Sequence, residues 1–488
     1  MATTVGTAYE MLIGGEWRGS EGGTFDVTNP ATGALVGTVP NATTDDLADA
    51  IDAADAALPA WRALTGKERG AILRKAAAAI MAEADHIAGV MTDEQGKPLA
   101  EARGEVAYAA SFFDWNAGEA ERVYGMTLPS IVAEKRVLVL KQAVGVSAAI
   151  TPWNFPAAMM TRKLGPALAA GCPMIVKPAS ATPLTAIEIV RIMHESGVPA
   201  GVVNVITSRR TGEISSHLFH DPRIKKISFT GSTEVGKELI RASADQVKRL
   251  SLELGGHAPF IVFDDADLDK AVTDVIASKY RNAGQTCVCA NRVYVQRGIH
   301  EAFLAELVKR VSTMKVGPGR EEGVVIGPMI DGRAVEKSDE HVRDAVAKGA
   351  KVLVGGHELK GNGHAGGHFY APTVIDGITP DMLIHYEETF GPVAGVTVFD
   401  TEDEVIKLAN DTVYGLAAYF STRDYARLLR VAERLEYGIV GANDGIISSA
   451  AAPFGGVKES GYGREGGPQG IDEYLDVKYV SIGGVGRA

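Results

Sequence analysis

Two of the three cysteines in this 488-residue chain, Cys287 and Cys289, are separated by one residue. A cysteine thiolate is a strong nucleophile, and a few per cent of a free thiol is already ionised near neutral pH. The small residues Ala283 and Gly284 would let a substrate approach the sulfur and nearby backbone N–H groups. An isolated cysteine is more often a small buried apolar residue, so this segment alone leaves both catalysis and packing open.

Glu253 and Asn154 are polar residues that could assist such a nucleophile. Glu253 lies on an apolar strand that ends in two glycines, where burial would raise its pKa toward that of a general base. Asn154 follows another apolar strand, and its side-chain N–H could donate to a developing oxyanion. A solvent-facing glutamate and an ordinary turn before Pro156 are the alternatives on local grounds.

A phosphate-binding turn is predicted at residues 230–238, between a strand and a helix. Gly231 lets the backbone approach a pyrophosphate, and Ser232 stands where a helix N-terminus would offer free N–H groups. The run is not a P-loop, because Glu238 replaces the Ser or Thr that would hold Mg²⁺. The G-x-G-x-x-G fingerprint is missing too, so a simple helix start is the alternative.

Lys177 and Ser180 stand at the end of a neighbouring strand, where a side chain can reach the adenosine ribose of a dinucleotide. A glutamate there would bind a free 2′-hydroxyl and repel a 2′-phosphate. This chain has one positive charge and one hydroxyl donor instead. The sequence therefore favours NADP as the cofactor and leaves NAD possible.

These residues need a scaffold that brings them together, and the pattern of apolar segments predicts one. Short apolar strands are expected at 147–151, 174–177, 202–206, 225–229 and 249–254, with helices at 156–170, 183–196, 211–219 and 233–244. Such alternation predicts an α/β fold with a doubly wound parallel sheet and right-handed crossovers. Helices are also expected from 45 to 102, and a second α/β region from 261 to about 438.

Composition excludes several classes of protein. The formal net charge of −12 argues against general binding to nucleic acid or to an anionic membrane, and no apolar run approaches a membrane span of ~20 residues. Three cysteines cannot form a disulfide framework, and the first residues do not read as a secretory signal, so we expect a cytoplasmic protein. The loop histidines His357, His364 and His368 lack further ligands, so no metal site is expected.

Taken together, six motifs resemble the aldehyde dehydrogenase superfamily over nearly the whole chain. They lie in the family's order at 152–156, 229–233, 252–256, 284–287, 388–392 and 453–456. The resemblance implies a coenzyme-binding domain (1–127 and 146–253), a catalytic domain (254–459) and an oligomerisation β-arm (128–145 and 474–488). It also implies a homodimer or homotetramer.

The resemblance implies a role for each candidate residue. Cys287 would attack the aldehyde, Asn154 and the Cys287 backbone N–H would hold the oxyanion, and Glu253 would activate the water that releases the acid. Contacts with the cofactor would come from Trp153, Lys177, Ser180, Gly231, Ser232, Glu388 and Phe390. Relatives that transfer the acyl group to coenzyme A lack the general-base glutamate, so Glu253 indicates hydrolysis.

The substrate is indicated by a closer similarity to succinate-semialdehyde dehydrogenases at 260–269, 285–291 and 445–449. In that subfamily two arginines and a serine hold the distal carboxylate, and they match Arg162, Arg281 and Ser448, with Ser449 as a second choice. Each arginine could instead form a surface or interface salt bridge. Asp444 departs from the subfamily pattern, so glutarate semialdehyde and α-ketoglutarate semialdehyde are alternative substrates.

Cys289 resembles the subfamily's second cysteine, which can form a disulfide with the catalytic one and silence it. This implies a redox switch, with simple packing as the alternative. Two other functional classes are open to the sequence: a cysteine hydrolase, which would need a positioned histidine, and an inactive structural relative. The presence of Asn154, Glu253 and Cys287 together argues against the inactive relative.

Overall fold

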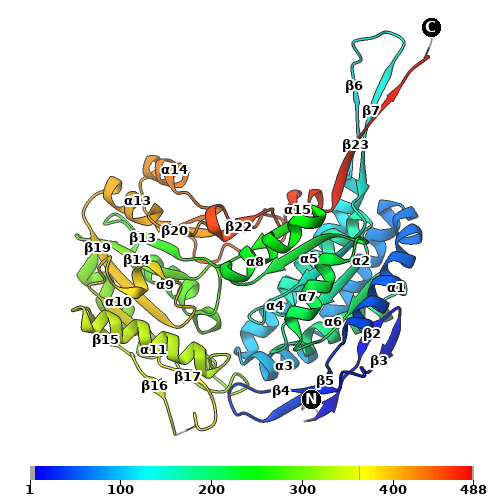
Figure 1. Cartoon of the computed structure of the whole chain (residues 1–488). Helices are drawn as coiled ribbons and strands as arrows, with labels where there is room; N and C mark the ends of the chain where they lie inside the picture. Colours follow the sequence, from blue (N-terminus) through cyan, green and yellow to red (C-terminus); the bar gives the residue numbers. More distant parts are fainter. Residues whose placement is uncertain (1–5, 362, 486–488) are drawn as a thin grey trace.

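The computed structural model describes residues 6–361 and 363–485, which form two α/β bodies and a narrow arm that projects from one of them (Figure 1). Residues 1–5 of the expected coenzyme-binding domain, residue 362 of the catalytic domain and residues 486–488 of the arm lie outside the described ranges. The two bodies are each built on one large sheet, and together they confirm the predicted α/β class.

The first body contains an eight-stranded sheet in the order β22-β12-β11-β8-β9-β10-β2-β3. Its five central strands are parallel: β8 (Val146–Ile150), β9 (Met174–Lys177), β10 (Val203–Val205), β11 (Ile224–Thr230) and β12 (Arg249–Glu253). The edges are antiparallel: β22 (Gly461–Tyr462), β2 (Met11–Ile13) and β3 (Glu16–Arg18). Lys177 pairs with Ile150 and Glu253 with Thr230, so the carboxyl ends of these strands share one edge of the sheet.

Helices pack around this sheet much as predicted. Those that follow the parallel strands are α5 (Ala158–Ala170), α6 (Leu184–Glu195), α7 (Thr211–His220) and α8 (Thr233–Ser243). The N-terminal helices are α1 (Thr44–Ala63), α2 (Gly66–Ala82), α3 (Ala84–Gln95) and α4 (Leu99–Glu119). Every residue of α5 is buried, including Arg162 and Lys163, and α4 packs along it. The last turns of α4 lie beyond the predicted helical region.

A small sheet near the N-terminus was not predicted. It contains β1 (Thr7–Ala8), β5 (Leu35–Pro40) and β4 (Thr24–Thr28), in that order. The strands are only two to six residues long, so each offers too short an apolar pattern to be predicted.

The second body contains a seven-stranded sheet in the order β15-β18-β19-β14-β13-β20-β21, parallel except for β15. Its strands are β13 (Ala258–Val262), β14 (Ala290–Gln296), β15 (Lys351–Val354), β18 (Thr373–Asp376), β19 (Val393–Phe399), β20 (Ala417–Ser421) and β21 (Ile439–Ala442). Its helices are α9 (Leu268–Lys279), α10 (His300–Val311), α11 (Gly332–Ala347), α12 (Leu383–Tyr386), α13 (Glu402–Asn410) and α14 (Tyr425–Arg434). Short pieces complete the chain: β16 (Glu358–Leu359), β17 (Phe369–Tyr370), α15 (Gln469–Asp472) and the 3₁₀ turns η1 (Ala120–Arg122), η2 (Ala244–Gln246), η3 (Arg281–Gly284) and η4 (Lys458–Ser460).

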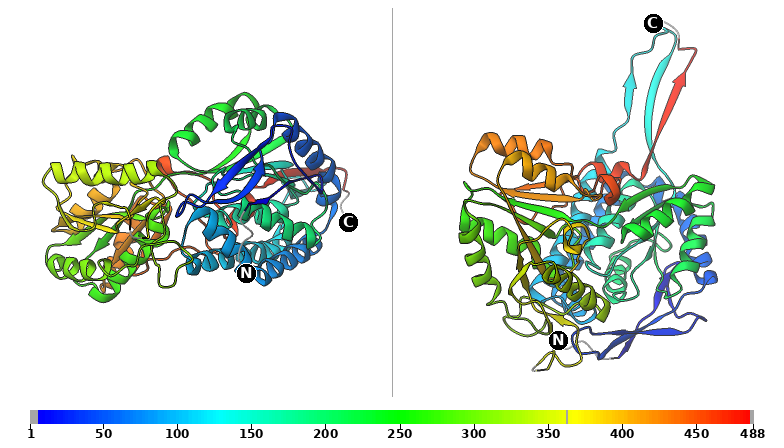
Figure 2. Two further views of the ribbon diagram at one scale, coloured as in Figure 1. Left: turned by 90° about the horizontal axis from the view of Figure 1, so that it is seen from below. Right: turned by 60° about the vertical axis from the view of Figure 1, so that its left-hand side comes forward.

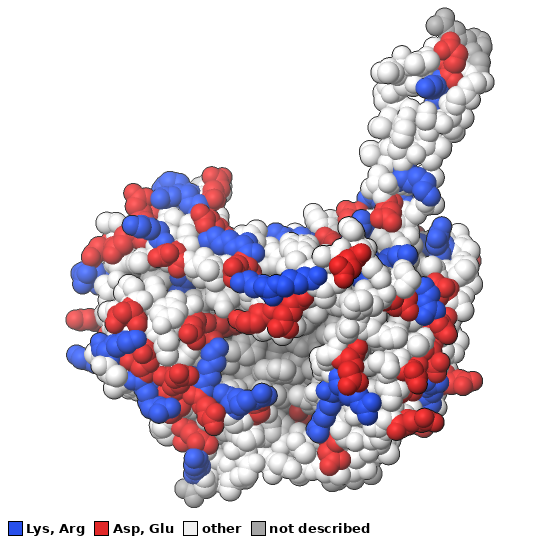
Figure 3. Space-filling model, in the orientation of Figure 1, with Lys and Arg blue, Asp and Glu red and all other residues white. Residues whose placement is uncertain are grey.

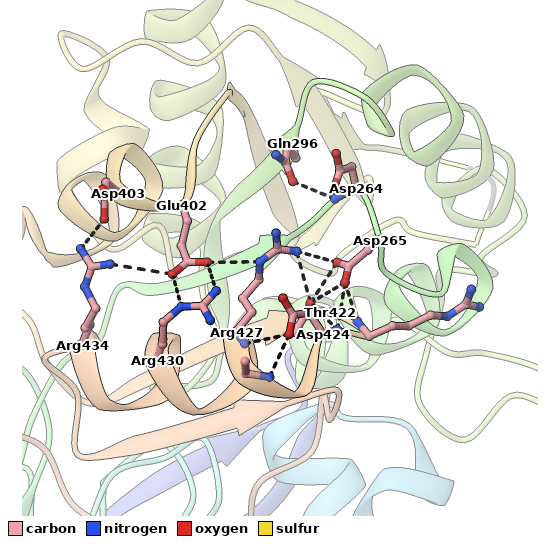
Figure 4. A network of polar contacts seen from close by, with 12 residues as sticks. Asp264, Asp265, Gln296, Glu402, Asp403, Thr422, Asp424, Arg427, Arg430 and Arg434 are labelled. Carbon is pink, nitrogen blue, oxygen red and sulfur yellow. Dashed lines mark hydrogen bonds and ion pairs between the residues drawn. The ribbon is translucent and has the colours of Figure 1, made fainter.

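Helix α14 is fixed mainly by charged contacts, because Val431 is its one fully buried residue. Arg427 joins Glu402 of α13 to Asp265, which follows β13, and Arg430 also donates to Glu402 (Figure 4). Exposed ion pairs contribute about 0–1 kcal/mol each. This network therefore ties α14 to α13 and to the loop after β13.

The arm is a three-stranded antiparallel sheet in the order β23-β7-β6, formed by β6 (Met126–Leu128), β7 (Arg136–Ala143) and β23 (Leu475–Ile482). Strand β23 pairs with β7 along its whole length, and the arm stands clear of both bodies (Figure 2). Charged side chains are mixed in sign over the visible face of both bodies but are few along the arm between its base and its tip (Figure 3). Within the described ranges, no helix is long and apolar enough to cross a membrane.

Candidate active site

Cys287 follows a strained turn, η3, that precedes strand β14. Asn282 and Ala283 have φ angles of 52° and 54°, in the left-handed region that residues other than glycine rarely adopt. Such residues cost of order 1–3 kcal/mol each unless their surroundings fix them. Here Glu101 accepts the Asn282 N–H at 2.8 Å, and Gln95 donates to the Asn282 side chain at 3.0 Å. Helices α3 and α4 therefore hold the turn that presents the cysteine.

Asn154 is tied to the same turn. Its side-chain nitrogen donates to the Gln285 carbonyl at 3.0 Å, and its own carbonyl accepts from Lys97 at 2.7 Å and from Asn282 at 2.9 Å. Lys97 is buried and also forms an ion pair with Glu105 of α4. An amide nitrogen carries two hydrogens, so one N–H of Asn154 is left to donate to another group.

A cavity of about 270 Å³ opens beside Cys287. It brings together seven of the predicted residues: Trp153, Asn154, Gly231, Ser232, Cys287, Glu388 and Phe390. The rings of Trp153 and Phe390 meet edge to face, 5.7 Å apart. Lys337 of α11 also lines the cavity, and sequence reasoning missed it because it belongs to no motif. Burial raises the pKa of Glu388, which accepts the Gly256 N–H, to about 7.

Gly231 makes the sharp turn between β11 and α8. A Cβ atom at this position would lie 2.3 Å from the tip of the buried Phe229 ring, so any larger residue would have to displace that ring. Its N–H donates to the Glu253 carbonyl at 3.1 Å, and Ser232 caps α8 by accepting the Val235 N–H at 3.4 Å. The N-terminus of α8 thus faces the cavity with free N–H groups, which is favourable for a phosphate.

Glu253, at the end of β12, is 2% exposed, and neither carboxyl oxygen has a hydrogen-bond partner among the described residues. Burial raises its pKa well above the ordinary value, and the charge of Glu465 raises it further, while Arg162 and Lys163 oppose the shift. The carboxyl group therefore holds its proton to higher pH than an exposed glutamate does, which is the behaviour expected of a general base near neutrality.

Glu465 was not singled out from the sequence, yet it is central to the buried charges. It accepts hydrogen bonds from Arg162, Lys163 and Ser228. Burial alone would raise the pKa of Glu465, but Lys163 and Arg162 hold it at about 2, so this carboxylate is ionised. A single glutamate in a glycine-rich tail gives no sequence signal for this role.

The two predicted arginines differ in the number of ion pairs and hydrogen bonds that they form. Arg162 is 1% exposed, donates through Nε to Glu465 and lies 4.0 Å from the Phe454 ring centroid, while its Nη1 has no partner among the described residues. Arg281 lies over the Phe155 ring and forms no ion pair within the described part of the chain. Burial raises the pKa of the Cys287 thiol to about 12, and both guanidiniums oppose this increase.

Seven predicted residues do not line the Cys287 cavity: Glu253, Arg162, Arg281 and Cys289, and also Lys177, Ser180 and Ser448. Lys177 is buried at the end of β9, where burial lowers its pKa to about 8, and its Nζ lies 3.5 Å from the Thr211 hydroxyl at the start of α7. Ser180 is half-buried in the loop after β9. Ser448 is half-buried in the loop after β21, and no contact in the described ranges joins it to either arginine.

Cys289 is buried and reduced, and its thiol donates to the Lys279 carbonyl at 3.2 Å. Cys287 and Cys172 are also free thiols. In the part of the chain that the structure describes, no group of three or more His, Cys, Asp or Glu side chains is placed to hold a metal ion.

The fold places a free cysteine, Cys287, beside a cavity at one edge of a doubly wound parallel sheet, an arrangement that suits an oxidoreductase. Residues 17–480 match the aldehyde dehydrogenase family, and the chain belongs to that family. It is 56% identical to the glutarate-semialdehyde dehydrogenase of Pseudomonas putida, over 97% of each chain. It is 55% identical to the NADP(+) succinate-semialdehyde dehydrogenase GabD of Escherichia coli, over 97% of this chain and 98% of that protein. The crystal structure of an aldehyde dehydrogenase from Brucella melitensis biovar abortus superposes with a TM-score of 0.95, at 56% identity and 97% coverage of each chain.

Proposed function

We propose that the protein oxidises a semialdehyde, an aldehyde whose far end is a carboxylate, with succinate semialdehyde as substrate and succinate as product. The observation that carries this proposal is the pair of arginines close to Cys287, whose guanidiniums retain buried N–H groups without partners in the described chain. A charge-assisted hydrogen bond is worth roughly 1.5–3 kcal/mol. Each contact would therefore favour a carboxylate-bearing aldehyde about 10- to 100-fold over an uncharged one.

Glutarate semialdehyde is the second candidate, because a relative at 56% identity carries that name. The α-ketoglutarate semialdehyde alternative rests on the neighbourhood of His257 and on the tail at 463–467, together with the Asp444 departure. These three substrates share an aldehyde at one end and a carboxylate at the other. They differ in length and in one oxo group.

The residues around Cys287 suit the two halves of the reaction. The Cys287 thiolate would attack the aldehyde carbon to form a carbon–sulfur bond, and the carbonyl oxygen would become an oxyanion held by the Asn154 amide and the Cys287 N–H. After oxidation to the thioester, Glu253 would take a proton from water as that water attacks the same carbon. The sulfur then leaves, and the carboxylic acid is released.

NADP is the proposed cofactor, with NAD possible, and when bound it supplies the hydride acceptor. The cavity beside Cys287, the tight Gly231 turn and the α8 N-terminus fit a dinucleotide. Trp153, Glu388 and Phe390 would border the nicotinamide side. Lys177 and Ser180 would contact the adenosine ribose, where a cation and a hydroxyl favour a 2′-phosphate, and the Escherichia coli relative is named for NADP.

We further propose a homodimer or homotetramer, built through the arm and acting in the cytoplasm. The arm exposes large apolar side chains, which are more stable when covered by another subunit: Met126, Leu128, Ile131, Leu140, Val477 and Tyr479. The division into coenzyme-binding, catalytic and arm regions is supported by the separate sheets, although β22 (Gly461–Tyr462) joins the first sheet from beyond the catalytic region.

Cys289 is proposed as a redox partner of Cys287. With peroxide as the oxidant, the two thiols would lose two hydrogens and form a disulfide, while the peroxide is reduced to water. Replacing Cys289 by Ala should abolish reversible inactivation by peroxide. Unchanged reversible inactivation in that variant would refute the switch.

A substrate panel tests the proposed function. Initial rates of nicotinamide reduction are measured with the succinate, glutarate and α-ketoglutarate semialdehydes and with the uncharged butanal and pentanal, each with NADP and with NAD. We expect the highest kcat/KM with succinate semialdehyde and NADP, and values at least about 10-fold lower for butanal. Equal kcat/KM for butanal and succinate semialdehyde would reject the proposed substrate class.

A further inference from the structure

The loop between β8 and α5, residues 151–157, carries Trp153 and Asn154 and contains no helix or strand. Its position therefore depends on contacts with other elements. Helix α5 begins at Ala158 without a side-chain cap from the residue before it. The first N–H groups of a helix have no partner within that helix, so another part of the chain must accept them.

Glu105 of α4 accepts these N–H groups. Its Oε1 accepts from the backbone nitrogens of Ala157 at 2.9 Å and Ala158 at 3.2 Å, and its Oε2 pairs with Lys97. The Lys97 ammonium in turn donates to the Asn154 carbonyl at 2.7 Å. Lys97 is 2% exposed and Glu105 is 4% exposed. One buried ion pair therefore holds the loop at two points, Asn154 and the start of α5.

A second buried glutamate shows that such a cap does not need a lysine. Glu94 of α3 accepts the backbone N–H groups of Leu184 at 2.7 Å and Thr185 at 2.8 Å, at the start of α6. Glu94 is fully buried and forms no ion pair within the described part of the chain. The feature that distinguishes the α5 cap is thus the contact between Lys97 and Asn154.

Stability alone does not account for this buried lysine. Taking two charges out of water is costly, and replacing a buried ion pair by apolar side chains is often neutral or stabilising. The pair does fix a direction, because the ammonium donates to one particular carbonyl. That Asn154 carbonyl also accepts from the Asn282 side chain at 2.9 Å, and the Asn154 amide donates to the Gln285 carbonyl at 3.0 Å. Together these contacts fix both the peptide and the side chain of Asn154.

We propose that Lys97, with Glu105 as its counter-charge, is a positioning residue that holds the Asn154 amide where the oxyanion forms. The inference rests on the proposed role of Asn154, and Lys97 itself does not touch the substrate. A displacement of about 1 Å can cost about 100-fold in rate. Loss of the Lys97 contact should therefore lower kcat and leave the binding of substrate and cofactor nearly unchanged.

The test is Lys97→Met, alone and combined with Asn154→Ala. In Lys97→Met we expect kcat with succinate semialdehyde to fall about 10- to 100-fold, while KM for the semialdehyde and for NADP stays within about two-fold. Asn154→Ala alone should lower kcat about 10²- to 10³-fold. In that background Lys97→Met should cost less than about two-fold more, because a residue that acts through another is not additive with it.

Alkylation of Cys287 by iodoacetamide distinguishes positioning of Asn154 from disruption of the whole site. The sulfur displaces iodide from a saturated carbon, so no oxyanion forms and Asn154 is not needed. The rate at Cys287, followed by mass spectrometry, should stay within about two-fold of normal in Lys97→Met. An alkylation rate that fell together with kcat would show that the cysteine had moved, and would reject the proposal.

Two further variants control for the loss of a buried charge. Lys97→Met combined with Glu105→Gln leaves no charge unpaired and keeps an amide oxygen to cap α5, so it should show the same loss of kcat. Lys226→Met removes another fully buried lysine, which pairs with Glu473 and lies beside Ser147 near the amino ends of the parallel strands. It should keep kcat within about two-fold.

The outcomes separate this inference from the proposed function. If Asn154→Ala keeps full kcat, the proposed role of Asn154 is wrong and the inference fails with it. If Asn154→Ala loses activity and both Lys97 variants keep it, only the role of Lys97 is wrong. Additive losses in the combined Lys97 and Asn154 variant would also reject the proposal.

Discussion

The two sides of Cys287 differ in how their polar groups are satisfied. On one side, the cavity bordered by Trp153 and Phe390 has aromatic walls, one cation, and a carboxyl group whose pKa is raised to about 7. On the other side, Arg162 and Arg281 retain buried N–H groups without partners in the described chain. Aromatic walls suit a flat ring, whereas unpaired cationic donors are costly until an anion binds. The difference supports the proposal that the nicotinamide binds on the first side and the substrate's far carboxylate on the second.

The largest expected effect comes from removing the Cys287 sulfur, which lies between the two sides. Cys287→Ala should lower the dehydrogenase rate by about 10⁴-fold or more, because no other thiol lies in the cavity lining of the described residues. Binding on both sides should survive, since neither depends on the sulfur. Nicotinamide absorbance measures the rate, and quenching of tryptophan fluorescence by NADPH measures cofactor binding. Turnover close to that of the unmodified enzyme would contradict the proposed chemistry.

The second-largest effect should be on stability, when the carboxylate of Glu465 that pairs with Arg162 and Lys163 is replaced. Glu465→Gln leaves Arg162 and Lys163 buried without a counter-charge, which should cost about 3–5 kcal/mol of unfolding free energy. Because folding lowers the pKa of Glu465, its stabilisation is present above the unfolded pKa and is lost as pH falls toward about 2.

Urea unfolding at neutral pH measures this loss. The matched control is Glu459→Gln, which breaks only the exposed pair with Lys237 and should change stability little. If the two variants unfolded at the same urea concentration, the buried ion pairs of Glu465 would not stabilise the fold more than an exposed pair does.

A smaller effect should distinguish the two sides by substrate. Arg281→Met should lower kcat/KM for succinate semialdehyde about 10- to 100-fold and leave butanal and the KM for NADP nearly unchanged, because only the anion side loses a donor. Arg297→Met is the control, since that arginine pairs with Asp400 on the surface. A rise in the KM for NADP of the same size would show that the two sides are not separate.

The smallest effect is the response to pH. Glu253 and Cys287 both act after losing a proton, and burial raises both pKa values, so kcat/KM should rise continuously between about pH 6 and about pH 9. An ordinary glutamate with a pKa of about 4.3 would give a flat profile over that range if it alone set the rate. A flat profile in the steady-state rate would contradict the raised pKa values.

Much of the framework could be predicted because it depends on local pattern. The five parallel strands of the first sheet each end within one residue of their expected bounds, because a short buried apolar run between helices has few other interpretations. Cys287, Asn154 and Gly231 could be placed near one cavity because each lies in a motif next to a strand: Asn154 and Gly231 follow strands, and Cys287 precedes one.

The remaining features depend on contacts between distant residues. Glu465 meets Arg162 across 303 positions, and Lys337 reaches the cavity from an amphipathic helix with an ordinary surface pattern. Ser448 is the opposite case, a residue predicted from a motif to lie near the arginines. Within the described ranges, the structure shows no contact between Ser448 and either arginine.

The position of Glu465 also bears on how the protein is made. Its two cations, Arg162 and Lys163, leave the ribosome some 300 residues before it does, on a helix whose every residue ends up buried. Nascent chains generally fold from the N-terminus as they emerge. Here two parts of the first body come from the final segment: the counter-charge for α5 and the edge strand β22. A chain that stops short of residue 461 therefore leaves two cations without their counter-charge and β12 without its edge partner, so truncated products should be more open to proteolysis than the full chain.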